Sequence, residues 1–139
     1  MMQEQPESIK LPYSITGTVV HGQQLGRQLG FPTANIQISE GKPFALNHGV
    51  YAVFAEVDNS RYSGIANAGI RPTIGGRQFQ LEVHLFDFRD DIYGKPIKVT
   101  FIHFIRPEKR FNSPEELVVQ IGRDIEEAKN VILPLALKP

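Results

Sequence analysis

Two short oxygen-bearing side chains, Thr33 and Asn35, lie one residue apart in the stretch LGFPTANI (29–36). Gly30 and Pro32 break the periodicity of this stretch, which suits neither a helix nor a plain strand. On an extended backbone, Thr33 and Asn35 would point to the same side. Their oxygens are hard ligands of the kind that Mg²⁺ accepts, with substrate phosphates and water completing its coordination. The alternative is a turn in which both side chains bond their own backbone, which is the commoner use of these residues.

The residues around and before this stretch are rich in glycine, namely Gly17, Gly22, Gly26 and Gly30. Glycine lets a backbone turn sharply and approach a ligand closely. Arg27 lies within this loop, so a guanidinium and backbone N–H groups could together hold a phosphate. The G-x-x-x-x-G-K-[ST] motif of the common phosphate-binding loop is absent. From composition alone, a plain glycine-rich hairpin is therefore the simpler interpretation.

Glu82 is a further candidate, within the run QLEVHLF. Leu81, Val83 and Leu85 would face a core, which leaves Glu82 and His84 on the opposite face of a strand. If that face lines a cleft, the carboxylate could accept a proton from a substrate hydroxyl that attacks phosphorus. If it faces solvent, Glu82 is an ordinary exposed acid. Periodicity does not distinguish the two.

Several classes of site and partner find no support in the sequence. The four histidines lack the H-x-x-x-H and H-E-x-x-H spacings of zinc sites, so we interpret them as structural, and the lack of cysteine excludes disulfides and thiol chemistry. Fifteen basic residues balance fifteen acidic ones without forming a basic stripe, so nucleic acid is not an expected partner. No apolar stretch approaches the ~18 residues of a membrane span. With no recognisable secretion signal, we expect a cytoplasmic protein that binds small molecules.

The elements that must position these residues read as strands for most of the chain. Five runs rich in β-branched and aromatic residues cover 11–20, 49–57, 61–70, 79–88 and 96–105. Short links at 57–61 and 90–95 favour hairpins and hence an antiparallel sheet. Five or six strands in so short a chain predict closure into a barrel, which removes the sheet edges. The run 40–49 is the one long connection with a clear loop composition.

The C-terminal segment predicts a helix that packs on this barrel. Asn112 or Ser113 can cap its N-terminus. Pro114 suits the first helical position, and Ser113 with Glu116 has the spacing of a capping box. Apolar residues recur at three- and four-residue steps and form one stripe, made of Leu117, Ile121, Ile125, Ala128 and Ile132. Pro134 is expected to end the helix.

Length predicts a single domain. The 139 residues suffice for one hydrophobic core and are too few for two ordinary domains. We place this domain at residues 11–139, behind a flexible lead-in at residues 1–10.

Several longer motifs together resemble those of the riboflavin kinase family, namely HGQQLGRQLGFPTANI, GVYAV, GIANAGIRPTIGG, LEVHLFDFRDDIYGKPIKVTFIHFIRPEKRF and SPEELVVQIGRDIEEAK. They occur in the family's order over most of the chain, which is far more specific than any single glycine pattern. The resemblance implies a mainly β fold, a small closed antiparallel barrel of six strands with a C-terminal helix packed on it. It also implies transfer of the ATP γ-phosphate to the ribityl 5′-hydroxyl of riboflavin, which gives FMN and ADP.

The resemblance further implies roles for the residues above. In the family, the P-T-A-N motif that begins here at Pro32 brings Thr33 and Asn35 to the nucleotide phosphates and to the metal, Mg²⁺ or another divalent cation. The nucleotide is covered by the glycine-rich loop, which here contains Gly22, Gly26, Arg27 and Gly30. Glu82, in the family's E-V-H strand, is the expected general base. The segments GIRPTIGG and IRPEKRFNS flank the sites in similar proteins, and the motifs identify no individual flavin contact.

Two other functions stay open beside the kinase. A flavin-binding module could keep the fold without catalysis, and a barrel could serve only as a protein interaction platform. Retention of Thr33, Asn35 and Glu82 favours catalysis. Bacterial relatives often carry this domain behind an adenylyltransferase domain that converts FMN to FAD. The 139 residues leave no room for it. The chain could therefore be an excised module, a single-function kinase with a separate FAD-synthesising adenylyltransferase as partner, or a paralogue that kept the fold and lost that contribution.

Overall fold

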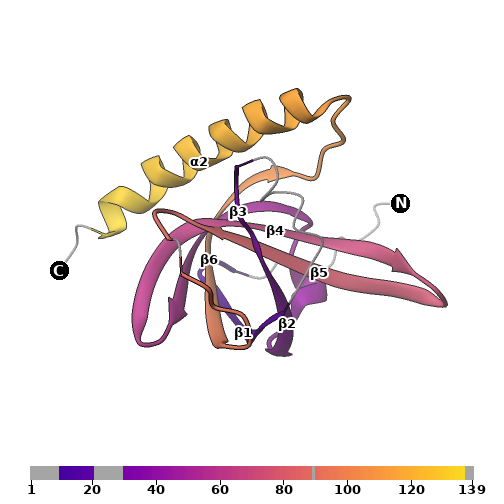
Figure 1. Cartoon of the computed structure of the whole chain (residues 1–139), viewed down its shortest axis with the longest axis horizontal. Helices are drawn as coiled ribbons and strands as arrows, with labels where there is room; N and C mark the ends of the chain where they lie inside the picture. Colours follow the sequence, from indigo (N-terminus) through magenta and orange to yellow (C-terminus); the bar gives the residue numbers. More distant parts are fainter. Residues whose placement is uncertain (1–9, 21–29, 89, 137–139) are drawn as a thin grey trace.

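The structure is a computed structural model that describes residues 10–20, 30–88 and 90–136. The described strands are β1 (Tyr13–Val20), β2 (Ala34–Glu40), β3 (Gly49–Val57), β4 (Ser60–Thr73), β5 (Gly76–Leu85) and β6 (Pro96–Pro107). A short 3₁₀ helix, η1 (Pro43–Ala45), lies in the predicted loop between β2 and β3. The long helix α2 (Pro114–Ala136) follows the last strand and lies across the barrel (Figure 1).

The six described strands form a closed barrel in the order β1-β2-β5-β4-β3-β6, in which every neighbouring pair is antiparallel. The predicted fold class is therefore confirmed. The link at 57–61 forms the predicted hairpin, with Asp58 and Asn59 at positive φ in its turn. The hairpin predicted at 90–95 is wrong, because β5 pairs with β2 and β4, and the chain must cross to another part of the barrel before β6.

Strand β2 was not among the five predicted runs. It begins at Ala34, immediately after the Gly30 to Thr33 segment that breaks the periodicity, and its pairing with β1 and β5 stabilises it. The other strands differ from the predicted runs mainly at β4, which continues to Thr73, and at β5, which already begins at Gly76. Together β4 and β5 form a hairpin that projects beyond the barrel wall (Figure 1).

Two hydrophobic cores lie on the two sides of β3. One fills the barrel and the other lies between the barrel and α2, so side chains of β3 are buried on both faces. The residues of β3 in the barrel are Tyr51, Val53, Ala55 and Val57, and those under α2 are Val50, Ala52 and Phe54. This double burial explains why GVYAVFAEV reads as an almost continuous apolar run without the usual alternation.

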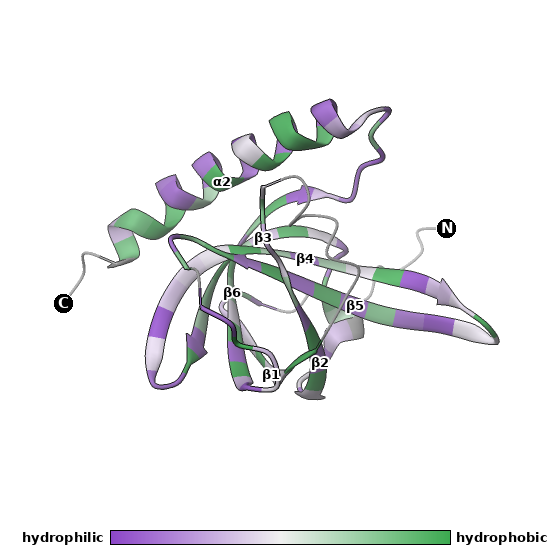
Figure 2. Cartoon of the chain, viewed as in Figure 1, coloured by the Kyte–Doolittle hydropathy of each residue, from purple (hydrophilic) through white to green (hydrophobic). Residues whose placement is uncertain are grey.

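Helix α2 begins with the predicted capping interactions. The backbone N–H of Glu116 donates to Ser113 Oγ at 3.2 Å, and the Glu116 carboxylate accepts from the N–H of Asn112 at 3.1 Å. The predicted stripe packs on the outer face of the barrel, where Ala128 and Ile132 are buried. Hydrophobic residues of α2 lie toward the barrel in Figure 2.

The prediction that Pro134 ends the helix is wrong, because α2 continues to Ala136. Proline removes one backbone donor and crowds the preceding turn. Here it lies two residues from the end of the helix, where few hydrogen bonds remain to be lost. In the described parts of the chain, no helix has the length and apolar character needed to cross a membrane.

Candidate active site

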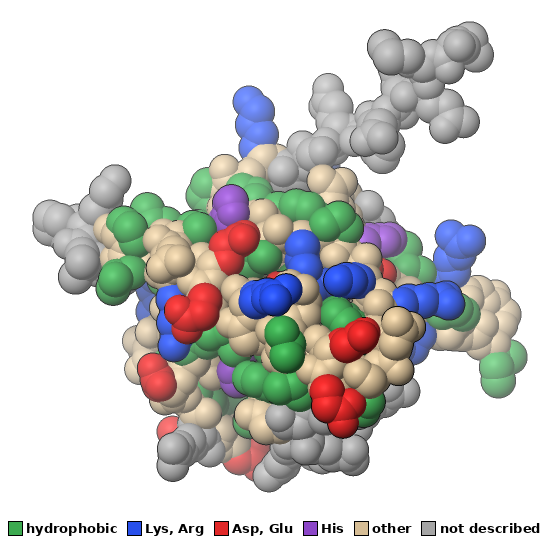
Figure 3. Space-filling view, turned by 90° about the horizontal axis from the view of Figure 1, so that it is seen from above, with side chains coloured by type: hydrophobic (Ala, Val, Ile, Leu, Met, Phe, Trp, Pro, Cys, Tyr) green, Lys and Arg blue, Asp and Glu red, His purple; other side chains and the backbone are tan. Residues whose placement is uncertain are grey.

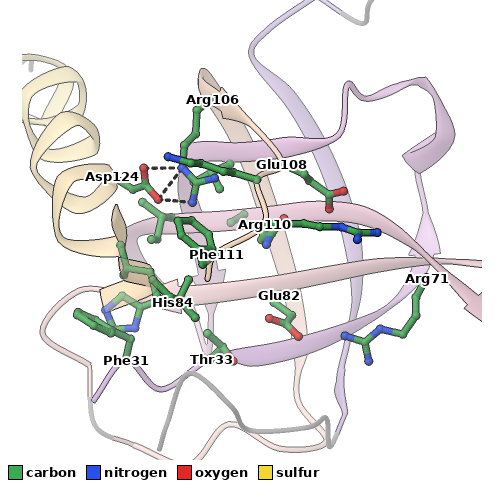
Figure 4. A pocket seen from close by; sticks show the side chains of 17 residues that line it. Phe31, Thr33, Arg71, Glu82, His84, Arg106, Glu108, Arg110, Phe111 and Asp124 are labelled. Atoms are coloured by element: carbon green, nitrogen blue, oxygen red, sulfur yellow. Dashed lines mark hydrogen bonds and ion pairs between the residues drawn. The ribbon is translucent and has the colours of Figure 1, made fainter. Parts of the chain in front are cut away.

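A pocket of about 560 Å³ opens between α2, the outer face of the barrel and the segment 108–113, which we call the β6–α2 segment (Figure 4). Its volume lies within the range of roughly 300–1,000 Å³ that is common for small-molecule sites. One part of the lining is apolar and consists of Val50, Ile65, Phe111, Leu117 and Ile121. The remainder is largely polar and charged, so the pocket suits a ligand with an apolar part and a polar part.

Glu82 lies in the polar part, on the outer face of β5. Leu81 and Val83 on either side of it point into the barrel core, as the alternation predicted. In the strand register, Glu82 is directly opposite Asn35 of β2 and Asn67 of β4. Directly opposed residues share one face of a sheet. The barrel thus brings three polar side chains into one row.

One amide side chain connects two neighbours in this row, Asn35 and Glu82. Gln80 Nε2 donates to Asn35 Oδ1 and to Glu82 Oε1, each at 3.2 Å. Asn35 is buried, with 7% of its surface exposed, and Thr33 lines the pocket two residues before it. The predicted Thr33, Asn35 and Glu82 are therefore neighbours in the fold, although 46 residues of sequence lie between Asn35 and Glu82.

The charge environment of Glu82 has two opposing influences. Burial raises the pKa of the Glu82 carboxyl above its ordinary value, and the positive charge of Arg71 partly offsets this increase in pKa. Arg71 and Glu82 point toward one another in Figure 4. A carboxyl with a raised pKa is a better proton acceptor when ionised than an ordinary exposed acid.

The segment that leads to Thr33 is fastened to β5 by His84. The Nδ1 atom of His84 lies 2.7 Å from the carbonyl oxygen of Pro32. A carbonyl oxygen can only accept, so Nδ1 carries the proton. The ring of Phe31 also packs edge-on against His84 at a centroid distance of 5.9 Å. These contacts fit the interpretation of His84 as a structural residue and place it in the pocket wall.

The predicted glycine-rich loop is only partly described. Gly22, Gly26 and Arg27 lie outside the described residues. Gly30 has φ +92°, in the left-handed region that favours glycine, and a side chain placed on it would meet no neighbouring atom. Glycine is therefore favoured at this position by the positive φ of the turn, and not by close packing.

The charged residues at the β6–α2 side of the pocket were not identified from the sequence as site residues. Cations and acids are interspersed on the side of the molecule where α2 lies (Figure 3). Besides the predicted Glu82, the charged residues that line the pocket are Arg71, Arg106, Glu108, Lys109, Arg110 and Asp124. Asp124 did carry a signal in the sequence, because it is an acid adjacent to the apolar stripe of α2. In the structure it is buried, with 1% of its surface exposed. A buried acid in such a place requires a partner, which is Arg106.

Residues 9–132 match the Flavokinase family, described as riboflavin kinase. The chain belongs to the riboflavin kinase family. It is 49% identical over 120 residues to a bifunctional riboflavin kinase/FMN adenylyltransferase of Haemophilus influenzae, and the match covers 85% of this chain and 38% of that protein. The chain thus spans less than two fifths of the length of that relative.

Solved structures agree with membership of the riboflavin kinase family. The riboflavin kinase of Trypanosoma brucei superposes with a TM-score of 0.63 at 26% identity, over 88% of this chain and 80% of that one. A protein described as a macrolide-efflux protein of Streptococcus pneumoniae superposes with a TM-score of 0.77 at 35% identity, over 86% of this chain and 39% of that one. This second similarity supports the fold.

Proposed function

We propose that this domain is a riboflavin kinase that transfers the γ-phosphate of ATP to the ribityl 5′-hydroxyl of riboflavin and releases FMN and ADP. The observation that carries the proposal is the proximity of Thr33, Asn35 and Glu82 beside a pocket of suitable size, in a member of this family. Because the transition state of phosphoryl transfer is loose, positioning and charge neutralisation can supply most of the catalysis.

The flavin ring would occupy the apolar part of the pocket. Phe111 offers an aromatic surface there, and Leu117 and Ile121 of α2 face Val50 and Ile65 of the barrel across it. A flat, largely apolar ring is well suited to such a lining. The ribityl chain would then extend toward the polar part, where its 5′-hydroxyl can reach Glu82.

Glu82 would act as the general base. Its Oε1 accepts the hydrogen bond from Gln80, which leaves Oε2 free to accept the proton of the 5′-hydroxyl as that oxygen attacks the γ-phosphorus. The proton moves to the carboxylate, the new bond forms from the hydroxyl oxygen to phosphorus, and the bond to ADP breaks. Arg71, beside Glu82, would meet the charge on the transferred phosphoryl group.

Thr33 and Asn35 would hold the divalent metal together with the phosphates of the nucleotide. Their donor chemistry fits, because both offer neutral hard oxygens, and Asn35 Oδ1 retains a lone pair beyond the one that accepts from Gln80. Mg²⁺ bound there would neutralise negative charge on the phosphates. The remaining proposed nucleotide contacts come from the loop that leads to Thr33, at Gly22, Gly26, Arg27, Gly30 and Pro32.

The test is product analysis after mixing the purified chain with riboflavin, ATP and Mg²⁺, with omission of each component as a control. FMN that appears only in the complete mixture supports the proposal. Riboflavin binding without FMN would instead favour the flavin-binding module. If riboflavin fluorescence is not quenched at all, the interaction platform becomes the better interpretation, because a ring bound against Phe111 should lose emission.

Three further expectations from the sequence belong with this proposal. An adenylyltransferase that converts FMN to FAD would act on the product, and the Haemophilus relative is named for both activities in one protein. The domain would begin at residue 11 and continue to residue 139, behind the lead-in at 1–10. Its setting would be the cytoplasm.

A further inference from the structure

The β6–α2 segment is fastened to helix α2 by an ion pair at the end of β6. Arg106 Nε donates to both carboxylate oxygens of Asp124, at 2.9 and 3.0 Å, and Nη2 donates to Oδ2 at 2.8 Å (Figure 4). The same guanidinium donates through Nη1 to the carbonyl oxygen of Pro107 at 3.2 Å. One planar group therefore connects α2 to the backbone at the point where the segment begins.

Stability alone is a weak reason for such a pair. The side chains of Arg106 and Asp124 are 17% and 1% exposed, so both charges have lost most of their hydration. Desolvation of a buried ion pair often cancels its attraction, and apolar residues of similar size can replace it without loss of stability. Gln120 donates a further hydrogen bond to Asp124 at 3.0 Å, which fixes the orientation of the carboxylate. The pair therefore specifies a geometry.

The geometry of the ion pair affects where Phe111 lies. The guanidinium carbon of Arg106 lies 5.7 Å from the centroid of the Phe111 ring, and both residues line the pocket. The first residue of the segment rests on β4, where a side-chain carbon added to Gly69 would overlap the carboxylate of Glu108. The segment ends in the cap of α2, where Asn112 donates to Glu116. Arg106 supplies a further anchor, at the end of β6 immediately before the segment.

We propose that Arg106 and Asp124 are positioning residues that hold Phe111 over the pocket and thereby set the affinity for the riboflavin ring. The carboxylate of Asp124 is 1% exposed and accepts hydrogen bonds from Arg106 and Gln120, so it acts through Arg106 and the β6–α2 segment. This inference rests on the proposed function and extends it from the residues that touch riboflavin to the pair that places one of them.

The experiment compares Arg106→Lys and Asp124→Asn with the wild type. Lysine keeps the charge but lacks the planar fork that reaches Asp124 and Pro107 together, and asparagine keeps the shape of Asp124 without its charge. We expect the Kd and KM for riboflavin to rise by about 10- to 100-fold, with the KM for ATP and the kcat at saturating riboflavin changing far less. Kd is measured by quenching of riboflavin fluorescence, KM and kcat by FMN formation, and folding by thermal unfolding.

Two further variants separate positioning from stability. Ile132→Ala destabilises the same helix from the second core, outside the pocket lining, and should lower Tm without changing the Kd for riboflavin. The double variant Arg106→Met with Asp124→Leu replaces the pair by apolar contact and should retain Tm while losing riboflavin affinity. A loss of riboflavin affinity that follows the loss of Tm across all these variants would overturn the proposal.

Failure of the proposed function would be seen separately. If the wild type binds riboflavin but makes no FMN, the kinase proposal fails, and the Kd comparison still decides the role of the pair. If the variants bind riboflavin as tightly as the wild type, the positioning proposal fails whether or not FMN is made.

Discussion

Glu82 on β5 lies directly opposite Asn35 on β2, and the amide of Gln80 donates to both side chains. The relation between the proposed base and the proposed metal ligand is thus set by strand register. A shift of one residue between β2 and β5 would turn one of the two side chains into the barrel core. The chemistry therefore depends on a rigid part of the fold.

Glu82→Gln should leave the Kd for riboflavin nearly unchanged and lower kcat by about 10²–10⁴-fold, because glutamine keeps the size of the side chain but accepts no proton. FMN formation gives kcat and fluorescence quenching gives the Kd. Unchanged turnover would remove Glu82 from the mechanism.

The activity should fall on the acid side at a pH above that expected for an ordinary carboxyl. Burial raises the pKa of Glu82, and the base works only when ionised, so kcat is lost as pH decreases through this raised pKa. Arg71 lowers the same pKa, so Arg71→Met should move the acid limb to still higher pH. Profiles of kcat against pH for both proteins measure this. A limb that moves to lower pH in the variant would contradict it.

Asn35→Ala should raise the Mg²⁺ concentration needed for half-maximal FMN formation, because it removes a proposed ligand of the metal. Asn67→Ala is the matched control, since Asn67 lies opposite Glu82 on the other neighbouring strand, β4. If both variants depend on Mg²⁺ as the wild type does, Asn35 is not a ligand.

Ser113→Ala should lower the free energy of unfolding by about 1 kcal/mol, because the N–H of Glu116 loses its hydrogen bond to Ser113 Oγ. Ser113→Thr keeps an acceptor and should retain most of that stability. Denaturant unfolding compares the three proteins. Equal stability of the alanine variant and the wild type would exclude a stabilising cap.

Sequence reasoning succeeded where the signal is local. The cap at Ser113, the apolar stripe of α2 and the outward direction of Glu82 each follow from residues a few positions apart. The barrel also followed, because many short strands in a small chain must close on one another.

The failures concern non-local pairing. The strand at Ala34 is stabilised by β1 and β5, and the crossing before β6 depends on the strand order of the whole barrel. The apolar part of the pocket forms only where α2, β3, β4 and the β6–α2 segment meet, so Phe111 carries no recognisable signal in its own neighbourhood. Among the pocket residues that were not identified, Asp124 differs, because the helical periodicity places this acid beside the apolar stripe and so indicates the burial that the structure shows.

Strand β3 has almost no side that faces water, because its alternate side chains belong to the barrel core and to the core under α2. Helix and barrel consequently share one wall, and neither can loosen without uncovering apolar surface of the other. Backbone amides of α2 should then exchange with solvent as slowly as those of β3, in one cooperative unit. A molecule held in the pocket between them would slow exchange in both.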